Sequence, residues 1–115
     1  SIISIVFIIG IIIGINESKI STIAISLMLA IACHNLLGLI AGYYFAKLFG
    51  YDKTVCKTVA IEVGMQNSGL AVVLAMKYFT PLSALPGAIF SIWHNISGSI
   101  LAGIWAKQEE GKIDI

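Results

Sequence analysis

Long apolar runs limit the folds open to this sequence more than any other feature. Polar and charged residues gather in short clusters, and the runs between them approach the roughly 20 residues that a helix needs to cross hydrocarbon. Of the 115 residues, 58% are hydrophobic and 11% are charged, whereas soluble domains average about 45–50% apolar and about 25% charged residues. The sequence therefore predicts an all-α integral membrane protein.

The runs predict about four transmembrane helices joined by short polar connectors. The predicted spans are 1–15, 20–46, 58–76 and 87–106, followed by a charged tail at 107–115. The first run is short and begins abruptly without a preceding Met, so we expect a truncated helix at a cut end. A loop containing both prolines is predicted at 77–86.

The lysines divide unevenly between the two sides that four crossings create. One side carries Lys47, Lys53, Lys57, Lys107 and Lys112, and the other carries Lys19 and Lys77. Short loops enriched in lysine stay in the cytoplasm, so we expect a cytoplasmic C-terminus. The isoleucine-rich, arginine-free composition fits a bacterial inner (plasma) membrane, and a net charge of +1 without a basic cluster argues against nucleic acid as a partner.

One polar cluster lies inside an apolar run rather than between two runs. The third run contains a carboxylate, two amides and a hydroxyl, which belong to Glu62, Gln66, Asn67 and Ser68. An ionisable side chain at this depth costs roughly 2.5–3.5 kcal/mol on insertion scales, so it usually faces a cavity and has a function. On a continuous helix Glu62 and Gln66 share one face and offer hard oxygen donors.

Two glycines, Gly64 and Gly69, bracket the amides and favour local unwinding near 64–69. Freed carbonyls together with a carboxylate suit a small hard cation, and the N-terminus of a half-helix suits an anionic group. The pattern predicts a discontinuous helix at an ion and substrate site. The structural alternative is that Glu62 lies near the helix start and reaches water, while the amides form interhelical hydrogen bonds.

The segment H-N-x-x-G occurs at 34–38 and again at 94–98. Five positions with three identities do not establish a repeat, and a lone histidine beside an asparagine is more often a packing residue than a ligand. Gly38 and Gly42, like Gly10 and Gly14, have the G-x-x-x-G spacing that allows helices to approach closely. Ordinary helix packing is the interpretation we favour for both pairs.

The string E-V-G-M-Q-N-S-G-L-A at 62–71 resembles the signature of the bile acid:sodium symporter family. A-L-P-G-A-I-F-S at 84–91, W-H-N-I-S-G at 93–98 and the His34–Asn35 pair extend the similarity over essentially the whole chain. The resemblance implies a ten-helix secondary transporter built from two inverted repeats. This chain resembles most of the second repeat.

The resemblance also implies the domain organisation and the site. Segment 1–15 would be a panel-type helix, and 20–107 would supply three core-domain helices, one of them broken near 64–69. The implied sodium ligands are Glu62, Val63, Met65 and Gln66, of which Val63 and Met65 act through backbone carbonyls. The implied substrate residues are Asn67, His94 and Asn95.

The implied function is sodium-coupled symport of an organic anion, bile-acid-like or another carboxylate or sulfonate, by alternating access. Na⁺ is the coupling ion, and no organic cofactor is expected. The alternatives are a proton-coupled or arsenite-type transporter and a non-transporting membrane scaffold. The sequence lacks H-E-x-x-H, G-x-S-x-G and a pair of membrane aspartates, so we do not expect an enzyme.

The first repeat, which would supply the remaining ligands, is not in this sequence. We therefore expect a fragment whose partner is the missing N-terminal half of the transporter. An antiparallel homodimer of a half-size protein would need insertion in both orientations, and the lysine bias disfavours it.

Overall fold

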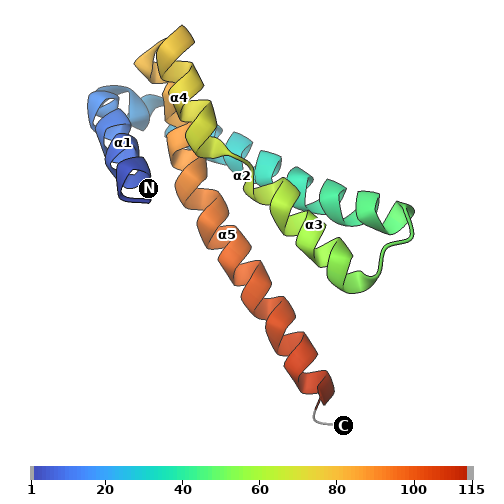
Figure 1. Ribbon diagram of the computed structural model, residues 1–115. Helices are drawn as coiled ribbons and strands as arrows, with labels where there is room; N and C mark the ends of the chain where they lie inside the picture. The colour runs from blue at the N-terminus through green and yellow to red at the C-terminus, as the bar shows by residue number, and fades with distance from the viewer. Residues whose placement is uncertain (1, 114–115) are drawn as a thin grey trace. The chain divides into compact units, whose positions relative to one another are not determined.

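The computed structural model describes residues 2–113, which form five α-helices and no strand (Figure 1). The helices are α1 (Ile2–Ile15), α2 (Glu17–Leu48), α3 (Lys53–Met65), α4 (Ser68–Tyr78) and α5 (Pro81–Ile113). The predicted all-α class is confirmed.

Two helical segments among the described residues are long and apolar enough to cross a membrane, Glu17–Leu48 and Lys53–Tyr78. They contain the predicted spans 20–46 and 58–76. The first run corresponds to a shorter apolar helix, Val6–Ile15. The fourth predicted span lies within α5. α5 is not among the helical segments that are long and apolar enough to cross a membrane.

The predicted proline loop is much shorter in the structure. Only Phe79 and Thr80 separate α4 from α5, which begins at Pro81. Proline is tolerated in the first turn of a helix because the N–H group that it lacks has no intrahelical partner there. The Thr80 hydroxyl accepts a hydrogen bond from the Ser83 N–H group at 3.3 Å, which caps the helix.

At the C-terminal end of α5, the predicted charged tail is helical as far as Ile113, and 114–115 lie outside the described residues.

The chain divides into two compact units. Unit 1 consists of 2–34 and 66–93, and unit 2 of 35–65 and 94–113. α1 and α4 belong to unit 1 and α3 to unit 2, whereas α2 and α5 contribute residues to both.

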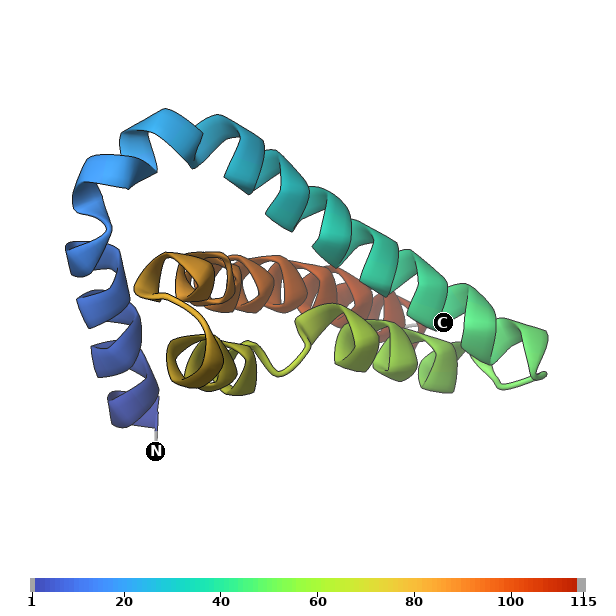
Figure 2. The ribbon, with the colours of Figure 1, turned by 90° about the horizontal axis from the view of Figure 1, so that it is seen from above.

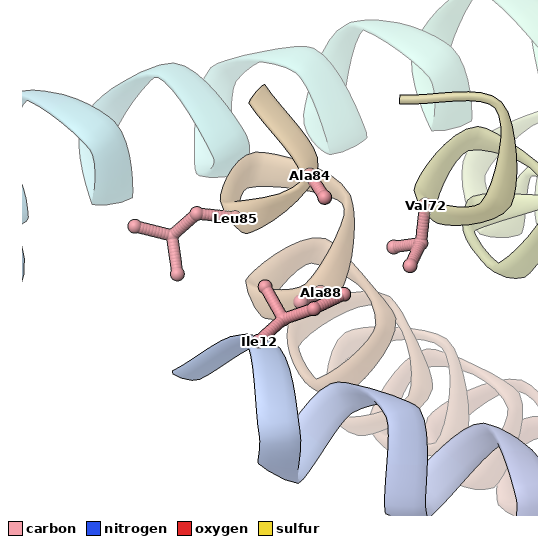
Figure 3. Packing of buried hydrophobic residues seen from close by; sticks show 5 residues of the cluster. All are labelled: Ile12, Val72, Ala84, Leu85 and Ala88. Carbon is pink, nitrogen blue, oxygen red and sulfur yellow. The ribbon is translucent and has the colours of Figure 1, made fainter. Parts of the chain in front are cut away.

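Unit 1 is held together by a small apolar core that joins α1, α4 and α5 (Figure 3). Its buried members are Ile12, Val72, Ala84, Leu85 and Ala88. Small side chains on α5 allow α4 to approach closely, since a Cβ added at Gly87 would lie 3.0 Å from Val72 Cγ2. The buried Asn16 amide donates to the carbonyls of Ile12 (2.8 Å) and Pro81 (3.2 Å), so the α1–α2 turn is tied to the start of α5.

Unit 2 depends on glycines that bring α2 against α3, and Figure 2 shows α3 alongside the C-terminal part of α2. A Cβ added at Gly42 would lie 2.8 Å from the Val59 carbonyl oxygen, and one at Gly38 would lie 3.1 Å from that of Val63. The G-x-x-x-G spacing thus serves helix packing here. At Gly10 and Gly14 an added Cβ meets nothing within 4 Å.

An ion pair closes the end of unit 2 at which α3 begins. Lys57 Nζ lies 2.7 Å from Glu109 Oε1, and Lys57 is only 7% exposed. The same ammonium group lies 5.7 Å from the centroid of the Trp105 ring. The start of α3 and the last turns of α5 therefore lie at one end of this unit.

Candidate functional site

The helix of the third apolar run is interrupted between Met65 and Ser68 (Figure 2). Gln66 has a φ of +39°, the one positive φ at a non-glycine residue in 2–113. Its carbonyl accepts a hydrogen bond from the Ser68 N–H group at 3.1 Å. Asn67 is the N-cap of α4, because its Oδ1 accepts from the Leu70 N–H group at 3.0 Å.

The interruption lies within the 64–69 segment where the sequence predicted unwinding, but the glycines are not the residues that unwind. Gly64 lies in α3 and Gly69 in α4, and neither has a positive φ. Gly64 is buried against Leu39 of α2, so its small size serves packing. The unwound residues are the two amides.

The carboxyl end of α3 has carbonyl groups without intrahelical partners, and polar side chains of unit 2 bond to two of them. The Asn35 amide donates to the Gly64 carbonyl at 2.9 Å. The His94 ring is hydrogen-bonded to the backbone of Met65. The Val63 carbonyl faces Gly38 of α2.

Asn35 connects three helices of unit 2. It is 3% exposed, and its Oδ1 accepts from the Ser97 hydroxyl at 2.7 Å while its Nδ2 bonds the end of α3. In the sequence Asn35 stands out only as part of the H-N-x-x-G segment and of the family resemblance, neither of which gives it a role. The available signal was the repeated H-N-x-x-G segment. Its second copy, at 94–98, contains Ser97, which bonds to Asn35, and His94, which bonds to the backbone of Met65.

Replacing Asn35 by alanine is expected to lower the free energy of unfolding by about 1–2 kcal/mol. The substitution leaves the Gly64 carbonyl without its buried donor, and interhelical hydrogen bonds in membrane proteins have measured values up to about 1–2 kcal/mol. Thermal or denaturant unfolding in detergent measures the change. The control is Ser26→Ala, because the Ser26 hydroxyl is exposed and bonds only its own helix at Ile23. Equal stability of the two variants would contradict a bridging role.

Glu62 lies in the last turn of α3 and is exposed. Within residues 2–113 its carboxylate makes neither a hydrogen bond nor an ion pair. The helix end beside it carries the negative partial charge of the helix dipole, which favours a cation there. A carboxylate in this position is available to bind one.

Unit 1 contains a cavity of about 480 Å³ beside the interruption. Its apolar wall comes from Leu27, Ala30, Ile31, Ala71, Pro86 and Phe90, and its polar edge from His34, Gln66, Asn67 and Ser68, with Gly87 completing the lining. A cavity of this size with one polar edge suits a small organic ligand that has an apolar body.

Side chains on the polar edge of the cavity form hydrogen bonds with other side chains of unit 1. The His34 ring donates from Nε2 to Gln66 Oε1 at 3.0 Å, and Ser91 Oγ lies 2.6 Å from Ser68 Oγ. The sequence indicated a packing role for His34, and the structure places its ring against the Gln66 side chain. Its partner is 32 positions away, so no local pattern indicated the bond.

The structure thus divides the predicted site residues between the units. Gln66 and Asn67 lie together on the cavity edge of unit 1. Glu62, Val63 and Met65 form the end of α3 in unit 2, with His94 bonded to Met65. Asn95 is also in unit 2, where it is exposed.

Known proteins similar to this chain are sodium-coupled transporters by name, although no family model matches it. The chain is 44% identical over 112 residues to an uncharacterized sodium-dependent transporter of Bacillus subtilis, YocS, and the match covers 97% of this chain and 35% of the relative. It is 42% identical over 106 residues to a probable chloroplastic sodium/metabolite cotransporter of Arabidopsis thaliana, BASS1, covering 91% of this chain and 26% of the relative.

The BASS1 protein of Oryza sativa subsp. japonica is likewise 42% identical over 91 residues, which are 78% of this chain and 22% of the relative. The chain spans about a third or less of the length of these relatives. Each match extends over most of the chain, and the names of these relatives agree with the family that the motifs at 62–71, 84–91 and 93–98 resemble. This chain therefore belongs to the bile acid:sodium symporter (BASS) family of membrane transporters.

Proposed function

We propose that this chain is part of a sodium-coupled symporter that carries an organic anion by alternating access, and that it holds part of the sodium site. The observation that carries the proposal is the segment Lys53–Tyr78, which is long enough to span a membrane and whose helix is interrupted shortly after Glu62. Glu62 is the only carboxylate in this segment. Glu62 lies three residues before the end of α3 at Met65. Transporters use such broken helices to bind ions near the middle of the bilayer.

The donor atoms that the family resemblance implies are of the kind that binds Na⁺. We assign the Glu62 carboxylate, the backbone carbonyls of Val63 and Met65, and Gln66 Oε1 as ligands, all of which are hard oxygens. A carbonyl oxygen has two lone pairs, so the hydrogen bonds at Met65 and Gln66 leave each group able to bind a cation. When bound, the ion supplies the positive charge that holds these oxygens together.

The remaining ligands would come from the part of the transporter that this chain does not span. The relatives are about three or more times longer than the matched segments, which is consistent with a missing N-terminal half. In the family's organisation, 1–15 would be a panel-type helix and 20–107 would form core helices.

The cavity of unit 1 supports an organic anion as the substrate. Asn67 uses its Oδ1 to cap α4, so its Nδ2 group remains to donate to a carboxylate or sulfonate. The apolar wall would receive the body of the substrate. His94 and Asn95 are proposed as further substrate residues on the strength of the family resemblance.

The protein would lie in the bacterial inner membrane with its C-terminus in the cytoplasm. The Lys57–Glu109 ion pair supports this topology, because it joins two lysine-rich segments at one end of unit 2. Both segments were predicted to lie on the cytoplasmic side.

Sodium is expected to raise the stability of the longer polypeptide that carries this sequence. A ligand that binds only the folded state at about 100 times its Kd adds about 2.7 kcal/mol. The measurement is the thermal unfolding midpoint in NaCl, with KCl at equal ionic strength as the control. Equal midpoints in the two salts would contradict a sodium site. Uptake driven by a proton gradient without sodium would favour the proton-coupled alternative.

A further inference from the structure

The His34 ring lies near the middle of the long helix α2 (Glu17–Leu48) and is held on two sides within unit 1. Its Nε2 donates to Gln66 Oε1 at 3.0 Å. The ring also makes a T-shaped contact with Phe90 of α5, with ring centroids 5.6 Å apart and an interplanar angle of 62°. A polar ring in the middle of an apolar span is costly, and these two contacts fix where its N–H group points.

The Gln66 amide needs such a fixed partner if it is to bind a cation. One end of the amide is an acceptor and the other is a double donor, so a rotation of the amide by 180° would present N–H groups where an oxygen is required. The backbone of Gln66, with φ at +39°, joins the two helices and lies outside both. Without the histidine, no hydrogen bond among the described residues would orient this side chain.

We propose that His34 is a positioning residue for the sodium ligand Gln66, an inference that rests on the proposed function. The ring N–H can bond only the oxygen end of the amide, so it selects the rotamer and the orientation in which Oε1 is the ligand. One lone pair of Oε1 accepts from His34, and the other remains for the cation. The T-shaped contact with Phe90 helps to keep the ring in place.

The opposite role is competition, in which His34 would occupy the oxygen and have to release it before the cation binds. The two roles predict opposite changes in affinity. Loss of a positioning residue weakens cation binding, because the free amide must then be ordered during binding. Loss of a competitor strengthens it.

The test is the sodium affinity of the full transporter polypeptide, measured from the rise in unfolding midpoint with NaCl concentration rather than from transport. His34→Ala is expected to weaken sodium binding about 10- to 100-fold, which is the usual effect of removing a group that orients a metal ligand. His34→Gln retains an N–H donor and is expected to recover at least part of the loss. Ser26→Ala, on an exposed position of the same helix, is the control and should leave the affinity unchanged.

A double-mutant cycle separates positioning from general destabilisation. In a Gln66→Ala background, His34→Ala should change the remaining sodium affinity less than about twofold, since the group that it orients is gone. Equal effects of His34→Ala in the two backgrounds, or tighter sodium binding by the single variant, would overturn the proposal. If the parent polypeptide shows no stabilisation by sodium over potassium, the proposed function itself fails, and this inference fails with it.

Discussion

Sodium-dependent uptake is expected to fall at least about 100-fold when Glu62 is replaced by alanine. The carboxylate is the one formal negative charge in the proposed ligand set, and it lies at the carboxyl end of α3, where the helix dipole adds only a partial negative charge. A 100-fold loss corresponds to about 2.7 kcal/mol of binding free energy. Reconstituted vesicles with an imposed sodium gradient, and a radiolabelled organic anion as cargo, measure the effect.

Two further variants give this prediction its controls. Glu62→Gln keeps the size and one oxygen of the side chain but removes the charge, so it should retain part of the sodium-induced stabilisation and little uptake. Glu17→Gln removes a carboxylate at the start of α2, outside the apolar part of the run, and should transport normally. Unchanged uptake and unchanged sodium dependence in Glu62→Ala would exclude Glu62 from the ion site.

The same substitution, glycine to alanine, is expected to have opposite effects at two positions. At Gly42 the new Cβ would lie 2.8 Å from the Val59 carbonyl oxygen and 3.0 Å from the Ala60 Cα atom. Both are backbone atoms of α3, so relief requires α2 and α3 to move apart. Overpacking of this kind costs about 1–3 kcal/mol, and we expect about 2–3 kcal/mol because no flexible side chain can yield.

At Gly10 an added Cβ meets nothing within 4 Å. Alanine there is expected to stabilise α1 by about 0.5–1 kcal/mol, because glycine loses more backbone entropy in a helix. Unfolding of the two variants in the same detergent measures the difference in sign. A loss of stability at Gly10 equal to that at Gly42 would mean that the close approach of α2 to α3 is not what makes Gly42 sensitive.

The location of the interruption was predictable to within a few residues, but its mechanism was not. Glycine indicates where a backbone is permitted to unwind, and Gly64 and Gly69 correctly bracketed the region. The structure uses Gly64 to admit Leu39 of α2 instead. The positive φ fell on Gln66, where the following Asn67 cap and the His34 bond compensate for the conformation. Those compensations come from side chains that only the folded chain brings together.

The polar partners of the site were harder to predict than its position. Asn35 and His34 bond to residues 29 and 32 positions away, and hydrophobic periodicity carries no information on such pairs. The loop predicted at the two prolines was wrong for a different reason. Both were read as loop residues, yet Pro81 begins α5 and Pro86 lies inside it, because a proline near the N-terminus of a helix removes few hydrogen bonds.

The Lys57–Glu109 ion pair limits how many times the chain can cross the membrane between these two residues. Residues whose side chains meet at 2.7 Å lie on one side of the membrane, so the chain between them must cross it an even number of times. If Lys53–Tyr78, which is long and apolar enough to cross a membrane, supplies one crossing, the return would fall to α5, the one described helix that follows it. In that topology α5 would span the bilayer although its His94, Asn95 and serines lower its hydropathy, and we would expect these polar groups to face protein rather than lipid.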